Sequence, residues 1–364
     1  MMKQQSISNK QFFFIVFVSI TCLTFFSVPN QLASQVKQDL WLSMLFGMLL
    51  DIYVAYILYK LSNQYKGQSI IQYTGSILGK AAGKIISLCF LLFFLGVMIT
   101  SMWIYCDFMS RSLMPETPQM VFSLTMVCCA GLATWLGIEA IARLSQLIGI
   151  VILVTSIVLF ICSLPYFQIQ NLLPQLEDGI MPPLRGAIYP GSWFGICITV
   201  GVLIPHLANP KKAFRMKSQA VMLGASIMTI YLMYSIAVMG PDMAGKFENP
   251  LYIFSRITNL VIFERVEVLL LLIFISGSFI TISILYFALT EGMAQWVGSK
   301  SPKIWIIVFG IIVIFSPFFP FSHNSPVVSN YLSYWFPVIA LCIEGGLTTM
   351  LFIIAMIRKK KADG

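Results

Sequence analysis

The chain has 364 residues, of which 58% are hydrophobic and only 10% are charged. Because soluble domains carry about 25% charged residues, this composition excludes a soluble globular protein and indicates an integral membrane protein. The net charge of +9 is not gathered into a basic face with interleaved aromatic residues, which argues against nucleic-acid binding. The eight cysteines lie in apolar stretches without metal-binding spacing, so we expect no metal ion and no cofactor.

Apolar stretches long enough to cross a bilayer recur along the whole chain. A spanning helix needs about 20 apolar residues. The stretches that meet this requirement are residues 11–34, 40–61, 81–110, 119–137, 142–164, 184–207, 218–239, 266–296, 304–321 and 334–357. The sequence therefore predicts an all-α integral membrane protein, a single transmembrane domain over residues 1–364 with ten transmembrane helices.

Positive charges are distributed unevenly between these stretches. When the connecting segments are assigned alternately to the two sides, most of the 23 lysines and arginines fall on one side, including Lys211, Lys217 and the basic tail at residues 358–364. Cytoplasmic segments carry the excess of lysine and arginine, so we expect both termini in the cytoplasm. The opposite side has two longer connections, residues 165–183 and 240–264, in which we expect short helices over the outer mouth.

Two of the ten stretches are interrupted, one in each half of the chain. The first is interrupted at residues 21–29 and the sixth at Pro190-Gly191, because proline removes a backbone donor and glycine favours other conformations. Five helices per half make the two halves run in opposite directions, and inverted repeats with discontinuous helices are typical of secondary transporters. We therefore expect a five-plus-five inverted repeat (LeuT-like) with discontinuous spans one and six. The two five-helix repeats are residues 11–164 and 184–357.

The side chains beside these interruptions are candidate ligand contacts. A helix break inside the membrane frees backbone groups that must find partners, and small or hydroxyl residues on facing helices can complete a site. The alternative is a pair of proline kinks in packed helices, with the hydroxyl residues serving helix packing. The candidate ligand-binding set is Thr24, Phe25, Ser27, Val97, Ser101, Tyr189, Gly191, Ser192, Trp193, Ser278 and Thr281.

Acidic residues inside the apolar stretches are a second kind of candidate. Asp51 lies near the middle of the second stretch and Glu344 within the tenth. Burying a charge in a membrane is costly, so an intramembrane acid is a functional candidate, and Asp51 is the candidate proton or coupling site. The alternative is an acid bonded to a neighbouring hydroxyl or a buried arginine. The sequence has no nucleophile elbow, metal-ligand cluster or phosphate loop, so we expect no enzymatic or catalytic function.

Several short motifs follow one another along the chain. They are Phe94-Leu95-Gly96-Val97, Thr117-Pro118, Asn171-Leu172-Leu173-Pro174, Asn209-Pro210-Lys211-Lys212 and Ile262-Phe263-Glu264-Arg265-Val266-Glu267. With these motifs the chain resembles the endospore germination permease family, the B subunits of germinant receptors, in the amino acid/polyamine/organocation transporter superfamily. It has Cys22 and Thr24 where that family has glycines before the first interruption. We therefore expect the second interruption to provide more of the backbone recognition.

The resemblance implies a receptor subunit in the inner membrane of spores. Such a subunit would work with an A-type membrane subunit and a C-type lipoprotein and respond to small nutrients. We expect a nutrient, such as an amino acid, to bind between spans one, three, six and eight and to start germination through these partners. One alternative is a secondary amino-acid transporter, proton-coupled through Asp51 or another buried acid. The other is a structural or pore-assembly subunit without a ligand of its own.

Overall fold

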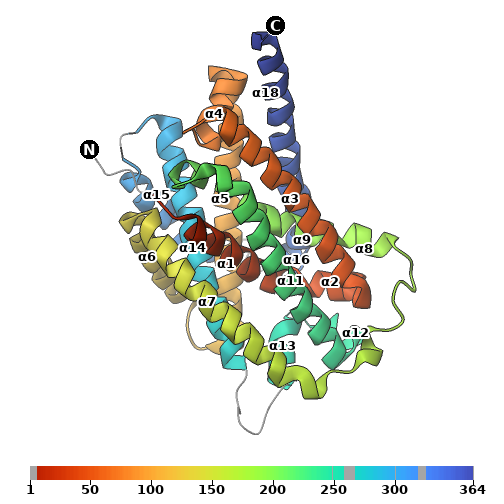
Figure 1. The fold of residues 1–364 in the computed structure, drawn as a ribbon. Helices are drawn as coiled ribbons and strands as arrows, with labels where there is room; N and C mark the ends of the chain where they lie inside the picture. Colours follow the sequence, from red (N-terminus) through yellow and green to blue (C-terminus); the bar gives the residue numbers. More distant parts are fainter. Residues whose placement is uncertain (1–5, 248, 258–266, 300, 319–324, 364) are drawn as a thin grey trace.

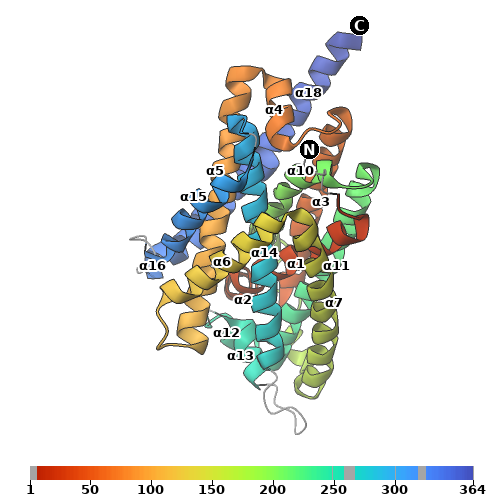
Figure 2. The same cartoon turned by 90° about the vertical axis from the view of Figure 1, so that its left-hand side faces the viewer.

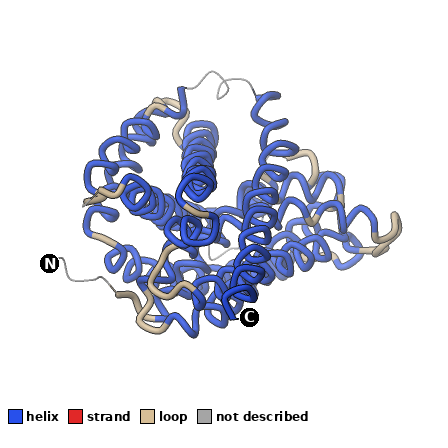
Figure 3. Tube along the Cα trace, turned by 90° about the horizontal axis from the view of Figure 1, so that it is seen from above, coloured by secondary structure: helices blue, strands red, loops and turns tan. Residues whose placement is uncertain are grey.

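The computed structural model describes residues 6–247, 249–257, 267–299, 301–318 and 325–363. Within these residues the regular structure is helical, apart from one bridge between Ile7 and Leu207. Seen from above, helices make up most of the described trace and loops join them (Figure 3). The prediction of an all-α protein is confirmed.

Seven helices are long and apolar enough to cross a membrane. They are Lys37–Gln64, Lys80–Leu113, Gln119–Leu136, Ile138–Tyr166, Pro210–Met239, Glu267–Val297 and Tyr331–Arg358. Each of them coincides with one predicted span. The remaining predicted stretches, residues 11–34, 184–207 and 304–321, form interrupted or shorter helices, so the total of ten spans stays a prediction.

The first interrupted segment consists of two helices in line. Helix α1 (Asn9–Ser27) begins at a capping box in which Ser8 and Gln11 each bond the other's backbone N–H, at 3.2 and 2.9 Å. Helix α2 (Pro29–Gln35) follows after the single residue Val28. Its first residue is a proline, which suits that position because the first N–H of a helix has no partner within the helix. The chain is therefore interrupted inside the predicted range 21–29.

The sixth segment is interrupted at a different place from the one predicted. Pro190 and Gly191 lie inside a helix, so the predicted break at this pair is wrong. Pro190 occupies the first turn of that helix, where a missing N–H costs no hydrogen bond. The α-helix instead ends at Phe194. The segment is built from α8 (Met181–Gly186), α9 (Ile188–Phe194), the 3₁₀ turn η5 (Gly195–Thr199), α10 (Val200–Leu203) and η6 (Ile204–His206).

Helix α1 lies at the centre of the bundle and packs against α7, α9, α11 and α14 (Figures 1 and 2). Two glycines allow close approaches between helices, one beside α1 and one beside α9. A Cβ atom at Gly277 would lie 2.8 Å from the Cβ of Cys22, and one at Gly47 would lie 2.7 Å from the ring of Pro190. The long helices are α3 (Leu40–Gln64), α5 (Lys80–Phe108), α6 (Gln119–Leu136), α7 (Ile138–Ser163), α11 (Ala213–Met239) and α14 (Glu267–Val297).

The two ends of the bundle carry different short elements. Helices α4 and α18 lie at the upper end in Figure 1, whereas α12 and α13, from one of the longer connections, lie at the lower end. The last membrane segment combines α17, the π-helical turn η10 and α18. These shorter elements are α4 (Ile70–Leu78), α12 (Pro241–Ala244), α13 (Pro250–Ile257), α15 (Lys303–Ile314), α16 (Ser325–Asn330), α17 (Phe336–Leu341), η10 (Cys342–Leu347) and α18 (Thr348–Asp363).

A short backbone joint links the start of α1 to the end of the sixth segment. The N–H of Ile7 donates to the carbonyl of His206 at 2.9 Å, and the N–H of Ala208 donates to the carbonyl of Ile7 at 3.0 Å. The Asn9 side chain adds a hydrogen bond of 3.0 Å to the carbonyl of Asn209. The two interrupted segments, almost 200 residues apart in sequence, are therefore tied together at one end.

Candidate functional site

A small cavity lies between α1, α5 and α14, where α1 approaches its end. Its volume is about 20 Å³. Four of the predicted ligand contacts meet in its wall, Ser27, Ser101, Ser278 and Thr281. The other lining residues are Cys22, Ile104, Phe274 and Ile282. The site thus combines hydroxyl groups from spans one, three and eight with an apolar wall.

Three of these hydroxyl groups lack a hydrogen bond in the described part of the chain. The hydroxyl oxygens of Ser27, Ser101 and Thr281 are buried without a partner, although Thr281 also lies close to the Cys22 thiol. Ser27 and Ser101 are therefore the clearest unpaired groups. Leaving a buried polar group unpaired costs about 1–3 kcal/mol, and buried polar groups in proteins are normally paired. Their convergence on one cavity indicates a place for a polar ligand or water.

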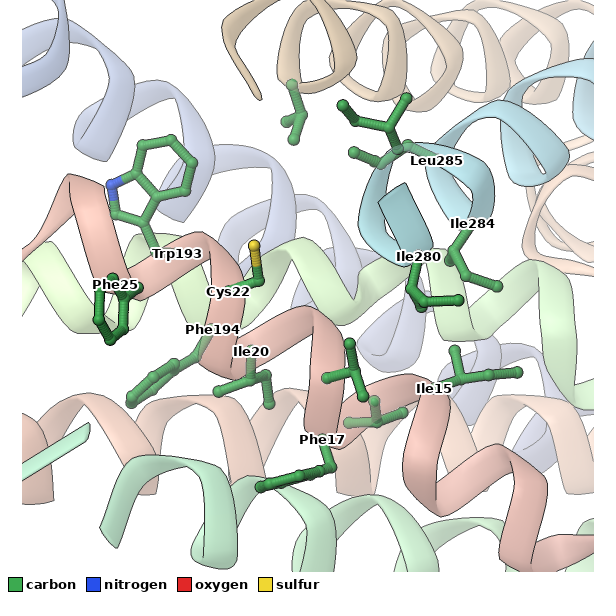
Figure 4. Packing of buried hydrophobic residues seen from close by; sticks show 14 of the residues in the cluster. Ile15, Phe17, Ile20, Cys22, Phe25, Trp193, Phe194, Ile280, Ile284 and Leu285 are labelled. Carbon is green, nitrogen blue, oxygen red and sulfur yellow. The ribbon is translucent and has the colours of Figure 1, made fainter. Parts of the chain in front are cut away.

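The thiol of Cys22 also lines this cavity. The Cys22 sulfur lies 3.3 Å from the hydroxyl oxygen of Ser278 and 3.6 Å from the carbonyl oxygen of Phe274. Both contacts cross from α1 to α14 at the close approach of Gly277. Figure 4 shows Cys22 on α1 and the neighbouring turns of α14. This contact fixes the spacing of the two helices beside the cavity.

A second cavity of about 10 Å³ continues along α1 and α14 and shares Thr281 with the first. Its wall includes Ile15 from α1 and Ile284 from α14, which Figure 4 shows on facing helices. Ser19 contributes a further buried hydroxyl without a partner among the described residues. Thr199 brings the sixth segment to this second cavity. The two cavities therefore form a series along α1 that Thr281 divides.

Aromatic side chains pack over the first cavity. Phe274, in the cavity wall, has its ring 4.9 Å from that of Phe108 and 5.8 Å from that of Tyr105. Phe108 in turn contacts Tyr252 of α13 at 5.3 Å. This cluster joins the cavity wall to the end of the bundle that carries α12 and α13. A cavity of about 20 Å³ has room for about one water molecule, so a molecule as large as an amino acid fits only if these helices separate.

The remaining predicted contacts from spans one and three lie outside both cavities. Thr24 donates its hydroxyl to the carbonyl of Ile20, at 2.7 Å, within α1. The Phe25 ring packs edge-on against Tyr231 of α11, with centroids 5.6 Å apart. Val97 is buried in α5. These side chains support the helices that carry the cavity wall.

The predicted contacts around Pro190 face α2, α3 and the last membrane segment. Tyr189 exchanges hydrogen bonds with Gln35 of α2, and Ser192 donates to the carbonyl of Tyr189 at 2.8 Å. The Trp193 ring lies 4.3 Å from that of Phe336 in α17. Gly191 packs against α3. The structure thus brings the second interruption to the cavities through Thr199, which the sequence interpretation did not include.

A buried ion pair lies on the other side of the sixth segment. The Lys217 ammonium nitrogen is 2.9 Å from a carboxylate oxygen of Asp51, and both side chains are almost completely buried. The expectation that Lys217 belongs to a cytoplasmic connection is wrong, because α11 begins at Ala213 and includes it. Glu344 is buried nearby and interacts electrostatically with both groups. Asp51 was predicted as a buried acid, whereas the only sequence signal for Lys217 was its place one residue before an apolar stretch.

The described residues contain no group of three or more His, Cys, Asp or Glu side chains able to hold a metal ion. Five residues of the motif that begins at Ile262, residues 262–266, lie outside the described residues.

Solved transporter structures share this fold. Mhp1, a nucleobase-cation-symport-1 family transporter in a closed conformation with bromovinylhydantoin bound, superposes with a TM-score of 0.71 at 14% identity, covering 96% of this chain and 78% of that chain. MhsT in complex with L-phenylalanine superposes with a TM-score of 0.61 at 11% identity, covering 97% and 99%. The fold is therefore that of a LeuT-like transporter and confirms the predicted fold class at this level.

Relatives in sequence carry spore germination names. Spore germination protein YndE of Bacillus subtilis (strain 168) is 27% identical over 350 residues, covering 92% of each chain. Spore germination protein A2 of the same organism is 25% identical over 342 residues, covering 92% of this chain and 91% of that one. The family model described as spore germination protein matches residues 6–325. This integral membrane protein, which is not an enzyme, therefore belongs to the spore germination permease family.

Proposed function

We propose that this chain is the membrane subunit of a nutrient germinant receptor and that it binds a small nutrient, an amino acid, in the cavity between α1, α5 and α14. The observation that carries the proposal is the meeting of buried hydroxyls on one cavity, of which those of Ser27 and Ser101 have no hydrogen-bond partner among the described residues. A ligand with ammonium and carboxylate groups can donate to and accept from hydroxyls. Ile104 and Phe274 supply apolar wall for its side chain.

The small volume of the cavity defines how binding would act. The described arrangement is closed, and a bound amino acid needs a wider one. The nutrient would therefore favour an arrangement in which α14 and α5 lie further from α1, and its effect is limited by its differential affinity for the two arrangements. On the side of α13, this widening requires the aromatic rings packed around Phe274 to move apart.

Membership of the family supports a proposal for the wider assembly. We propose that the protein lies in the spore inner membrane with ten spans in a five-plus-five inverted repeat, both termini cytoplasmic, and passes its change of arrangement to A-type and C-type partner subunits. The common location of α4 and the basic helix α18 at one end supports this orientation (Figure 1). Protease digestion of protoplasts with a tag on the C-terminus tests it, because a tag cleaved from outside would reverse the orientation.

The nutrient proposal is tested by dose–response curves of spores that carry single substitutions. The probe is an equimolar mixture of amino acids, and the readout is the fall in optical density of the spore suspension. Ser101→Ala and Thr281→Ala each remove one hydrogen bond worth about 0.5–1.5 kcal/mol, so the half-maximal concentration should rise by up to about tenfold. Ser276→Ala is the matched control, because its hydroxyl bonds only to its own helix backbone in the described structure.

Unchanged dose–response curves in both cavity variants, with the protein present at normal level, would overturn the binding site. A shift caused equally by Ser276→Ala would point to a general loss of α14 stability instead.

A secondary transporter is the second candidate, and the buried charges at Asp51, Lys217 and Glu344 favour it. In this alternative Asp51 is the proton or coupling site, and an amino acid crosses the membrane. Uptake of a radiolabelled amino-acid mixture into vesicles that contain this chain alone separates the two functions. Accumulation driven by an imposed pH gradient supports transport, whereas germination responses without accumulation support the receptor.

A further inference from the structure

Among the described residues, two acidic side chains and one basic side chain lie buried together near the end of α9. Asp51 comes from α3, Lys217 from α11 and Glu344 from η10. If all three groups were ionised, the cluster would carry a net charge of −1 inside the membrane domain. A buried charge without compensation is costly, and such a group is normally neutralised or paired.

Lys217 is already used by Asp51. The Lys217 ammonium, the single cation of the cluster, forms an ion pair with Asp51 at 2.9 Å. By contrast, both carboxylate oxygens of Glu344 are buried and form no hydrogen bond with the described residues. Only the main chain of Glu344 is held locally, since the Thr348 hydroxyl donates to its carbonyl. Glu344 is therefore the acid for which the cluster has no counter-charge.

The sixth segment approaches Glu344 directly. A Cβ atom built at Gly195 would lie 1.8 Å from one carboxylate oxygen of Glu344, so the carboxyl group packs onto the main chain at that residue. Gly195 follows the last residue of α9. The last carbonyls of a helix carry partial negative charge, so an ionised carboxylate is disfavoured there and a protonated one, which can donate a hydrogen bond, is favoured.

We propose that Glu344 is a proton-binding site that holds its proton while the sixth segment packs against η10. The Asp51–Lys217 pair remains charged, and Asp51 and Lys217 are the charged groups that act on Glu344. The proton comes from water and returns to water when the two segments separate, leaving a hydrated carboxylate. Proton binding thus stabilises the closed arrangement, and alkaline conditions favour the separated one. The inference is independent of the nutrient proposed above.

Infrared spectroscopy of the full chain tests the site without any nutrient. The purified protein is placed in micelles of dodecyl maltoside, a detergent without carbonyl groups, in choline chloride at neutral pH, and the C=O stretching band of protonated carboxylic acids is recorded in H₂O and D₂O. We expect one such band in the native protein and its loss in Glu344→Gln. Glu116→Gln, at an exposed glutamate, should retain the band.

Substitutions of the ion pair should change the band in opposite directions. In Asp51→Asn, Lys217 becomes available to Glu344, which should ionise, so the band should disappear. In Lys217→Met, two acids remain without a cation, so a second band should appear. Glu344→Asp should shift the band instead of removing it, which keeps the test valid if Glu344→Gln fails to fold.

Three results would overturn the proposal. The first is the absence of a carboxylic-acid band in the native protein at neutral pH. The second is a native band that persists in a folded Glu344→Gln variant. The third is a band that disappears when sodium chloride replaces choline chloride, which would make Glu344 a metal-cation site. None of these results depends on whether Ser101 and Thr281 bind a nutrient.

Discussion

Gly277 of α14 faces Cys22 of α1 so closely that a Cβ atom at position 277 would lie 2.8 Å from the Cβ of Cys22 and 3.2 Å from its sulfur. Both residues adjoin the cavity that contains the unpaired hydroxyls, and Cys22 is part of its wall. The spacing of these two helices therefore controls both packing and the size of the candidate site.

Gly277→Ala should force α14 away from α1. Overpacking of this kind costs about 1–3 kcal/mol, so thermal unfolding of the purified protein should shift to lower temperature and the nutrient dose–response should change with it. Gly96→Ala on α5 is the matched control, because a Cβ there meets no atom within 4 Å. Equal unfolding temperatures for the two variants would contradict the close contact.

Phe274→Ala should open the first cavity toward α13. Removing a buried phenylalanine costs about 3–5 kcal/mol and leaves space beside Cys22. In a variant with Cys22 as its single cysteine, a water-soluble thiosulfonate reagent should modify the thiol faster after this substitution. Phe309→Ala, at a buried position of α15, should leave the rate unchanged. A rate that rises equally in both variants would mean general loosening of the bundle.

Substituting one member of the Asp51–Lys217 pair should destabilise the protein more than substituting both. Lys217→Met removes the cation that Asp51 is paired with and should cost about 3–5 kcal/mol, whereas the double variant Asp51→Leu with Lys217→Met should recover much of that loss. Calorimetry of the reconstituted protein measures both. The surface pair Glu139–Arg143, at 3.9 Å and exposed, should contribute only about 0–1 kcal/mol. Additive effects in the buried pair would rule out their coupling.

Ser8→Ala tests the start of α1. Loss of an N-cap hydroxyl costs about 1 kcal/mol, and the joint formed by Ile7 depends on the same turn. Amide hydrogen exchange of residues near Ser8 and Leu207 should increase together. An increase confined to α1 would show that the joint is independent of the cap.

Hydropathy predicted the seven long helices, because burial in a membrane requires apolar length whatever the packing. The break before Pro29 could also be predicted from the local sequence, since a proline begins a new helix there. Pro190 was misleading, because its effect depends on where the helix begins, and the sequence does not mark the start of α9. Lys217 was misassigned for a related reason. Its partner Asp51 lies 166 positions away, and only the packing of α11 on α3 brings them together.

The residues of the candidate site were likewise predicted only in part. Ser27, Ser101, Ser278 and Thr281 were proposed as hydroxyl groups on helices expected to be neighbours, and the packing places them in one wall. Tyr189, Ser192 and Trp193 were proposed from the position of a break that lies further along the chain. The rotation of α9 about its axis decides which neighbours they touch, and that rotation is a property of the whole bundle.

The joint between Ile7 and Leu207 has a mechanical consequence. Because both interrupted segments are clamped to each other at one end, they share a common pivot there and cannot slide past one another without breaking its hydrogen bonds. Displacement should therefore grow with distance from the pivot and be largest near α2 and α8. Spin labels at the exposed positions 10 and 211, beside the joint, should keep a constant separation, whereas the distance between a pair of labels on α2 and α8 should change.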